Sequence, residues 1–311
     1  MSKTAEFREL PSIQGVLPVF QTPFREDESI DFDVLAQEID WLFECGADGL
    51  VMAMVSEVLR LSTHEREEMA EFVCRTGGQR GVVIVSVGSE SSHTSQQLAL
   101  HAEAVGAHAV MAIPPVSVGL GDAELRRYYE RILESVKIPV VVQDASGYVG
   151  RPMAIELQAE LYREYGERVL FKPEATPIGP RLTELHNATG GTATGRTATV
   201  FEGSGGMALV DSYQRGVSGT MPGADLIKPL VALWQALEAG NELRAQQLSL
   251  PLVSLVALQN SLDAFLAVEK HLLVQQGIFN NTVVRGPVGY RIDEPTRQEV
   301  DRLFQALMQV V

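Results

Sequence analysis

The feature that most constrains the fold of this 311-residue chain is a regular alternation of short apolar runs with longer segments of helical periodicity. Short apolar runs predict β-strands that are buried on both faces, and apolar residues at spacings of three and four predict helices. We expect strands at 15–21, 49–53, 82–88, 108–114, 139–145, 169–174, 198–203 and 217–222. We expect helices between and after them at 33–44, 63–75, 92–105, 122–135, 153–165, 178–187, 206–215 and 227–239.

Eight such strand–helix units predict an α/β protein with a (β/α)8 TIM barrel. An open doubly wound sheet is the competing fold, but the first strand is followed by Phe20-Gln21-Thr22-Pro23-Phe24 and not by a glycine-rich dinucleotide fingerprint. The remainder predicts three more helices at 242–261, 263–277 and 294–311. We therefore expect a barrel over residues 1–240 and a C-terminal three-helix extension over 241–311, placed against the outside of the barrel or in a subunit contact.

Charge and composition exclude several classes of partner. The formal net charge is -15, from 25 basic and 40 acidic residues, which argues against nucleic acids and anionic membranes as partners. The chain shows no apolar run as long as a membrane span and no signal-peptide layout at its start, so we expect a cytoplasmic protein. The six histidines show no metal-ligand spacing, and we expect no metal.

The principal candidate for chemistry is Lys172, which ends the apolar run at 169–174. Strand alternation places Lys172 and Glu174 on one face, at the strand end where barrel active sites lie. A buried lysine loses pKa, and its partly neutral amine can attack a ketone to form a Schiff base. A simple Lys172–Glu174 ion pair is the alternative. The other lysines are expected in an N-terminal arm, at the opposite rim, on an outer helix and in the tail: Lys3, Lys137, Lys228 and Lys270.

Further candidate residues follow the other strands. Glu174 is a candidate acid–base group or only a partner that balances the charge of Lys172, and Gln143 either orients substrate or is a satisfied rim amide. Ser56 either holds a substrate carboxylate or caps the following turn. The segment Gly203-Ser204 precedes a helix and accepts an anion or only forms a turn. The remaining candidates for substrate binding are Thr22, Glu57 and Met221.

With these features the chain resembles the dihydrodipicolinate synthase/N-acetylneuraminate lyase family over nearly its whole length. The resemblance is carried by 15–24, 46–50, Ser56-Glu57 with 61–66, and Phe171-Lys172. It implies that Lys172 forms a covalent imine with a small-molecule 2-keto acid without an external cofactor. It also implies a homo-oligomer, namely a tetramer built as a dimer of dimers.

Several positions depart from the family pattern. The usual Gly-Thr-Thr-Gly-Glu stretch is replaced by Ala53-Met54-Val55-Ser56-Glu57, so both threonine hydroxyls are missing. Gln143 replaces the strand-five tyrosine that relays protons, and Tyr148 falls where the synthases carry an arginine for a second carboxylate. The tyrosine that usually comes from a neighbouring subunit has no counterpart in 114–117. These departures argue against a working dihydrodipicolinate synthase.

One branch of the family fits better. The segments 142–145, Ser56-Glu57, Phe171-Lys172-x-Glu174 and 219–221 are similar to the L-2-keto-3-deoxyarabonate dehydratases. The resemblance therefore implies a Schiff-base hydro-lyase that dehydrates a 2-keto-3-deoxy sugar acid. A pyruvate-dependent aldolase or lyase, a dihydrodipicolinate synthase-like enzyme and a non-catalytic keto-acid-binding barrel are the alternatives.

Overall fold

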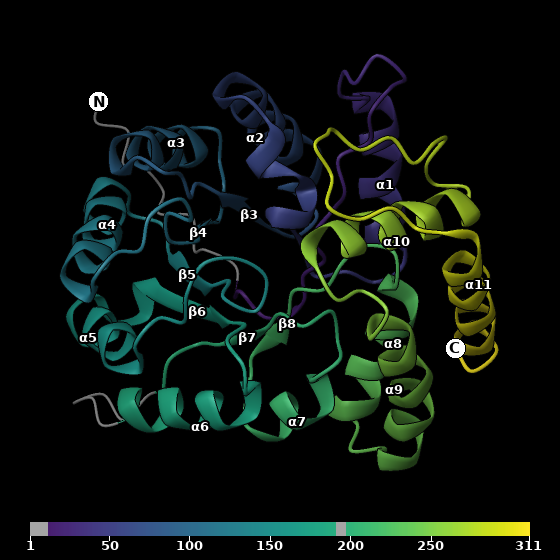
Figure 1. Ribbon diagram of the computed structural model, residues 1–311. Helices are drawn as coiled ribbons and strands as arrows, with labels where there is room; N and C mark the ends of the chain where they lie inside the picture. The colour runs from purple at the N-terminus through teal and green to yellow at the C-terminus, as the bar shows by residue number, and fades with distance from the viewer. Residues whose placement is uncertain (1–11, 191–196) are drawn as a thin grey trace, which may run out of the picture.

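A computed structural model describes residues 12–190 and 197–311 of the chain, and in them strands alternate with helices in the expected order (Figure 1). The strands are β1 (Gly15–Val16), β2 (Gly49–Met52), β3 (Val82–Ser86), β4 (Ala109–Ala112), β5 (Val140–Asp144), β6 (Val169–Pro173), β7 (Phe201–Glu202) and β8 (Gly219–Thr220). The helices that follow them are α1 (Phe32–Glu44), α2 (Thr63–Gly77), α3 (Ser92–Ala104), α4 (Asp122–Ser135), α5 (Ile155–Tyr165), α6 (Ile178–Thr189), α7 (Leu209–Gln214) and α8 (Ile227–Glu238).

The strands close into a cylinder in which neighbours are parallel. Strands β2 to β6 form one hydrogen-bonded sheet in chain order, and β1, β8 and β7 form a second. Bridges between Val19 and Val51 and between Phe171 and Val200 join the two sheets. The helices α1 to α8 surround the strands (Figure 1). The predicted (β/α)8 barrel is confirmed.

Alternate residues along each strand enter two separate apolar layers, as strands buried on both faces require. One layer fills the interior of the barrel, and the other lies beneath the surrounding helices. The interior layer includes Leu17, Val51, Ile84, Met111, Val141 and Leu170. The outer layer includes Leu50, Val83, Val110, Val142 and Phe171.

The helix predicted at 206–215 begins later, at Leu209. Gly205 and Gly206 have φ values of +69° and +93°, in the left-handed region that glycine enters without steric cost. These two residues turn the chain away from β7 before the helix can start, so α7 is short.

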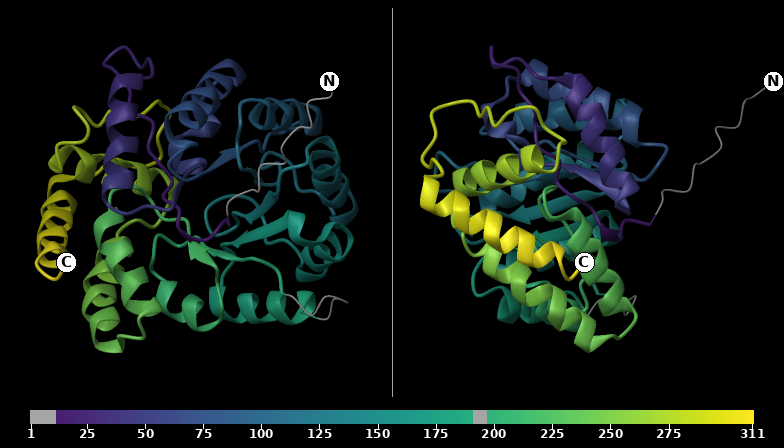
Figure 2. Two further views of the ribbon diagram at one scale, coloured as in Figure 1. Left: turned by 180° about the vertical axis from the view of Figure 1, so that it is seen from behind. Right: turned by 90° about the vertical axis from the view of Figure 1, so that its right-hand side faces the viewer.

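The C-terminal part forms α9 (Glu242–Val256), α10 (Leu262–Gln275) and α11 (Glu294–Met308). Helix α9 packs on α8, and α11 packs on α9, at the outside of the barrel (Figure 2). Helix α10 instead contacts the short 3-10 turn η1 (Met54–Ser56) that follows β2, so it lies at the mouth of the barrel. The expectation that the extension packs only on the outside or in a subunit contact was therefore wrong for α10. Its buried residues include consecutive positions from Ala264 to Leu266, as in a helix covered on several sides.

None of the helices in the described part of the chain is both long and apolar enough to cross a membrane.

Lys270, which the sequence placed in the tail, is completely buried on α10. Its ammonium group donates to Glu57 Oε1 at 2.5 Å and to the carbonyl oxygen of Val283 at 2.7 Å, and lies 4.6 Å from the ring centroid of Phe24. Glu57 is equally buried and adopts a left-handed φ of +56°. This ion pair ties α10 to the turn after β2.

We predict that Lys270→Ala lowers the free energy of unfolding by about 3–5 kcal/mol, because it leaves the Glu57 carboxyl buried without its cation. Lys228→Ala removes an exposed lysine and should change the unfolding free energy by less than about 0.5 kcal/mol. Urea unfolding followed by circular dichroism measures both. Equal stability of the two variants would show that this pair does not hold α10 in place.

Candidate active site

The candidate site is organised around the amine of Lys172 at the C-terminal end of β6. Leu170 belongs to the interior layer and Phe171 to the outer layer, so alternation turns Lys172 into the barrel. The Lys172 residue is 4% exposed, and its Nζ lies 3.2 Å from Glu174 Oε1. An amine in this position has one carboxylate partner and lies beside open space in the barrel mouth.

Gln143 completes a three-residue group with Lys172 and Glu174. Strands β5 and β6 pair Gln143 with Lys172, and Gln143 Nε2 donates to Glu174 Oε2 at 2.7 Å. The two oxygens of one carboxylate thus face an amine and an amide. Burial raises the pKa of Glu174 above its ordinary value, while Lys172 and the Gln143 hydrogen bond act in the opposite direction.

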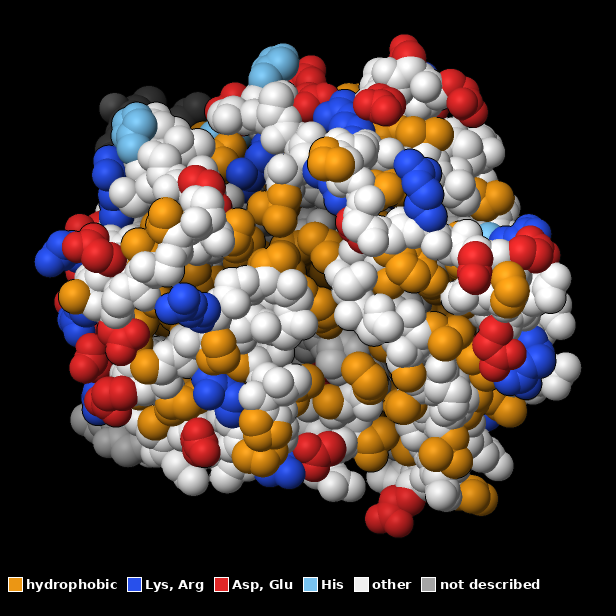
Figure 3. Space-filling model, viewed as in Figure 1, with side chains coloured by type: hydrophobic (Ala, Val, Ile, Leu, Met, Phe, Trp, Pro, Cys, Tyr) orange, Lys and Arg blue, Asp and Glu red, His pale blue; other side chains and the backbone are white. Residues whose placement is uncertain are grey.

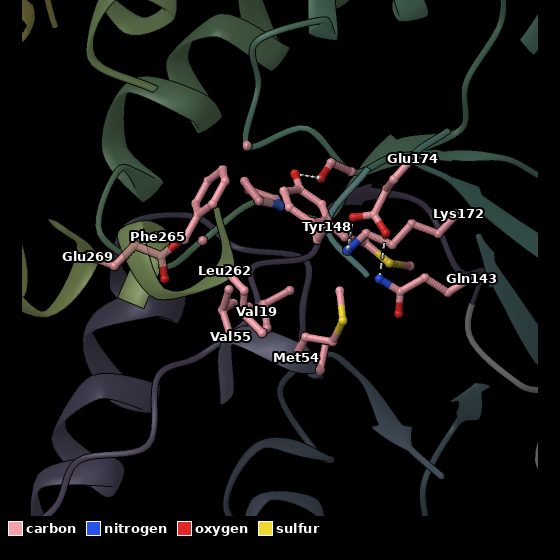
Figure 4. Close-up of a pocket in the computed structure, with 16 residues that line it drawn as sticks. Val19, Met54, Val55, Gln143, Tyr148, Lys172, Glu174, Leu262, Phe265 and Glu269 are labelled. Atoms are coloured by element: carbon pink, nitrogen blue, oxygen red, sulfur yellow. Dashed lines mark hydrogen bonds and ion pairs between the residues drawn. The ribbon is translucent and has the colours of Figure 1, made fainter. Parts of the chain in front are cut away.

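These three residues line a pocket in the mouth of the barrel. Figure 3 shows a hollow in this face with apolar side chains around it, and Figure 4 shows the residues that line the pocket. Gly203 and Met221, both expected from the sequence, line it too. Other parts of the wall come from the turn after β2, the loop after β8 and helix α10, and include Ala53, Met54, Val55, Pro222, Gly223, Leu262 and Phe265.

Four other candidates lie outside this lining. The Thr22 hydroxyl donates to the Ser56 carbonyl oxygen at 2.6 Å. The Ser56 hydroxyl donates to the Phe20 carbonyl oxygen at 2.6 Å and accepts from the Ala53 backbone N–H at 3.1 Å. Glu57 is engaged with Lys270, and the Ser204 hydroxyl donates to Glu202. These contacts fit roles in fixing the turns after β1, β2 and β7.

Tyr148 lines the pocket, although the sequence reasoning considered it only as the replacement of an arginine. Its hydroxyl donates to the Gly203 carbonyl oxygen at 3.3 Å, and its ring packs edge-on against Phe265. Burial, followed by the nearby carboxyls of Glu174, Glu202 and Glu269, raises the pKa of this phenol. A tyrosine a few residues after the end of a barrel strand was the sequence signal that could have identified it.

The loop that carries Tyr148 is held by Asp144, which points away from the pocket at the end of β5. Asp144 Oδ1 accepts from the Ser146 backbone N–H at 3.2 Å, and Oδ2 accepts from the Met153 backbone N–H at 2.9 Å. Arg181 lies 3.5 Å from Oδ2. Adjacent residues of β5 therefore have different roles. Gln143 faces the pocket, and Asp144 fixes the loop beside it.

Glu269 on α10 is a second carboxyl that lines the pocket, and no sequence pattern indicated it. It accepts a hydrogen bond from the Gln21 side-chain amide, and the Gln21 backbone N–H donates to Glu38 Oε1 at 2.9 Å. Burial raises the pKa of Glu38 to about 8 and that of Asp225 to about 7. Burial, reinforced by Asp225 and Glu38, raises the pKa of Glu269 well above its ordinary value.

Within the described residues no group of three or more His, Cys, Asp or Glu side chains is arranged to hold a metal ion.

We predict that Gly203→Ala reduces formation of a pyruvate imine on the order of 100-fold, because misplacing reacting groups by about 1 Å has effects of this size. A Cβ at position 203 would lie 2.6 Å from Lys172 Cε and 2.7 Å from Glu174 Oε1, so both side chains would have to move. Borohydride trapping and mass spectrometry measure the imine. Gly121→Ala, whose added Cβ meets no atom within 4 Å, is the control, and equal trapping by both variants would contradict the prediction.

We also predict that Glu38→Gln flattens the pH dependence of stability. The folded protein keeps a proton on Glu38 that the unfolded chain loses, since the pKa rises from 4.5 to about 8 on folding. The contribution of this group is complete below pH 4.5 and is lost as the pH rises toward 8, by up to about 1.4 kcal/mol per pH unit. In urea unfolding between pH 4.5 and about 8, the Glu38→Gln variant should lose this dependence of the unfolding free energy on pH. Glu44→Gln, at an exposed position of α1, should keep it, and a wild-type slope in Glu38→Gln would refute the assignment.

The chain is similar in sequence and fold to several known proteins. The chain is 26% identical over 251 residues to the L-2-keto-3-deoxyarabonate dehydratase of Azospirillum brasilense, covering 78% of this chain and 80% of that one. It is 27% identical over 293 residues to the 4-hydroxy-tetrahydrodipicolinate synthase of Rhizobium meliloti (strain 1021), covering 93% and 96%. A putative dihydrodipicolinate synthetase from Pseudomonas aeruginosa has the same fold, with a TM-score of 0.87, 24% identity, and coverage of 96% of this chain and all of that one.

The family resemblance seen in the sequence is confirmed by the match of residues 12–307 to the sequence model of the dihydrodipicolinate synthetase family. The chain therefore belongs to the dihydrodipicolinate synthetase family, whose members are lyases that act through a covalent lysine Schiff base and use no external cofactor.

Proposed function

We propose that this protein dehydrates a 2-keto-3-deoxy sugar acid through an imine on Lys172. The observation that carries the proposal is the placement of the Lys172 amine 3.2 Å from Glu174 in a pocket whose other described lining residues include no cation. A keto acid has one carboxylate and one ketone, and the pocket offers one amine. The similarity to an L-2-keto-3-deoxyarabonate dehydratase supports this substrate class.

The carboxylate of the substrate is assigned to the turn after β2. Met54 and Val55 line the pocket and begin the 3-10 turn η1, so their backbone N–H groups have no partner within that turn. Two N–H groups side by side can hold a carboxylate without the missing threonine hydroxyls. In this role the Ser56 hydroxyl supports the turn from behind, through its bonds to Ala53 and Phe20.

Imine formation requires a neutral amine, and Glu174 is the group that takes the proton. Its raised pKa allows the carboxylate to accept a proton from the Lys172 ammonium, which leaves a neutral pair in a dry site. The amine then attacks C2 of the keto acid, and the ketone oxygen leaves as water after receiving protons. Gln143 keeps the carboxylate beside the amine during these steps through its 2.7 Å hydrogen bond.

Dehydration follows from the electronic effect of the imine. The C2 iminium draws electrons from C3, so Glu174, returned to its carboxylate form, removes a C3 proton to give an enamine. The enamine pushes electrons back toward C4, and the C4–O bond breaks as the hydroxyl leaves with a proton. Hydrolysis of the resulting imine returns Lys172 to its starting state.

Condensation with a second acid is disfavoured by the charge of the pocket. A second carboxylate would need a cation or several donors, because burying it unpaired is costly. Besides Lys172, the described lining residues include the carboxyl groups of Glu174 and Glu269 and no second cation. The homotetramer implied by the resemblance and the cytoplasmic location expected from the sequence remain predictions.

We predict that borohydride with L-2-keto-3-deoxyarabonate adds a fixed mass to the peptide that contains Lys172. The peptide that contains Lys270 should stay unmodified, because that amine is held by Glu57 and Val283 away from the pocket. Lys172→Met should abolish both labelling and turnover, and Glu174→Gln should lower kcat by about 10²–10⁴-fold, as expected for loss of an acid–base group. Circular dichroism of both variants should match that of the wild type, which separates loss of chemistry from loss of the fold.

Product analysis distinguishes this proposal from its alternatives. Loss of water alone supports dehydration, whereas release of free pyruvate would indicate an aldolase. Thermal stabilisation by 2-keto acids without any trapped imine would show a binding protein and end the proposal.

A further inference from the structure

We propose that Glu269, from helix α10 of the C-terminal extension, is the general acid that protonates the departing C4 hydroxyl. This inference rests on the proposed dehydration, and it assigns to a named side chain the proton that this step requires. The proposal gives the C-terminal extension a catalytic role, because α10 supplies one of the two carboxyls among the described residues that line the pocket.

The position of Glu269 fits the far end of a substrate attached to Lys172. Figure 4 shows Lys172, Glu174 and Gln143 together at one side of the pocket, and Glu269 with Phe265 at the opposite side. A substrate bound through C2 extends from the amine across this space. The carbon that loses oxygen is then two bonds from C2, on the side of the pocket away from the strand that carries the amine.

The carboxyl group of Glu269 is held firmly and only 1% exposed. Its Oε2 accepts from the Gln21 side-chain amide, while Oε1 lies against Gly223 in the pocket wall. A Cβ at position 223 would fall 2.2 Å from Oε1, so a larger residue there would displace the carboxyl group. Oε1 of Glu269 therefore lies at the wall of the pocket, and the hydrogen bond from Gln21 holds Oε2 behind it.

The charges around Glu269 favour its protonated form. Asp225 from the loop after β8 and Glu38 from α1 act to keep the proton on it, whereas Lys172 on β6 and Lys270 on α10 act against this, and burial has the largest effect. Glu174 differs, because it contacts an amine and an amide donor directly, and both favour the ionised form. Two carboxyls in one pocket with such different surroundings are suited to the separate roles of base and acid.

Every proton and electron pair is accounted for in the proposed step. Glu174 takes a proton from C3, and the electron pair of that bond forms the enamine. The enamine electrons then form the C3=C4 bond as the C4–O bond breaks. The leaving oxygen takes the proton of Glu269 and departs as water, and Glu269 becomes a carboxylate that regains a proton from solvent when the product leaves.

The experiment compares two substrates that differ only in the leaving group, 4-hydroxy-2-oxobutanoate and 4-chloro-2-oxobutanoate, in single turnover with wild type and Glu269→Gln. Hydroxide needs a proton in order to leave, whereas chloride does not. We expect Glu269→Gln to slow water loss by about 10²–10⁴-fold and chloride release by less than about fivefold. Borohydride trapping of both substrates on Lys172 should be unchanged, which also shows that the variant is folded.

Glu44→Gln is the control, since Glu44 is an exposed carboxyl on α1 and does not line the pocket. It should dehydrate the hydroxy substrate within about fivefold of wild type. Equal slowing of both leaving groups by Glu269→Gln, or water loss at the wild-type rate, overturns the assignment of Glu269. Wild-type protein that forms the imine but loses neither water nor chloride from either compound would instead refute the dehydration itself, and with it this role.

Discussion

The site depends on placing an amine inside the barrel without leaving its charge unpaired. The layer beneath Lys172 is apolar, with Leu170 and Val141 one pleat below, so an isolated ammonium group there would be strongly unfavourable. Glu174 supplies the compensating charge, and Gln143 satisfies the oxygen that the amine does not contact. The same contacts that make this burial tolerable allow a proton to move between amine and carboxylate, so the stability and the proposed reactivity of the site have one origin.

The open space beside the Lys172 amine exists because glycines, which have no side chain, lie next to the functional groups. Gly203 faces Lys172 and Glu174, and Gly223 faces Glu269, at distances that leave no room for a Cβ. Asp144, turned outward, fixes the loop that brings Tyr148 over the pocket. The shape of the pocket is therefore set by backbone and by residues that would not be recognised as functional from their chemistry.

The hydroxyl groups that are missing relative to the family pattern have counterparts elsewhere in the pocket. Two hydroxyl groups are absent from the turn after β2 and a phenol is absent from β5, but the pocket contains three other groups that can carry a proton: Glu174, Tyr148 and Glu269. They come from β6, from the loop after β5 and from α10. Under the proposed mechanism, the chain uses the imine-forming lysine of the family and takes its acid and base from β6 and α10.

The amino-acid sequence by itself determined those features of the protein that depend on residues close together in the chain. Hydrophobic periodicity fixed the number and order of the barrel units, and alternation along 169–174 placed Lys172 and Glu174 on the inner face, because both effects act over a few residues. Only the tertiary structure decided where α10 lies, and with it the burial of Lys270 and the entry of Glu269 into the pocket. Periodicity shows which residues share a face of a helix but not what that face packs against. The partners of these two side chains, Glu57 and Gln21, are 213 and 248 residues away in the chain, so only folding brings them into contact.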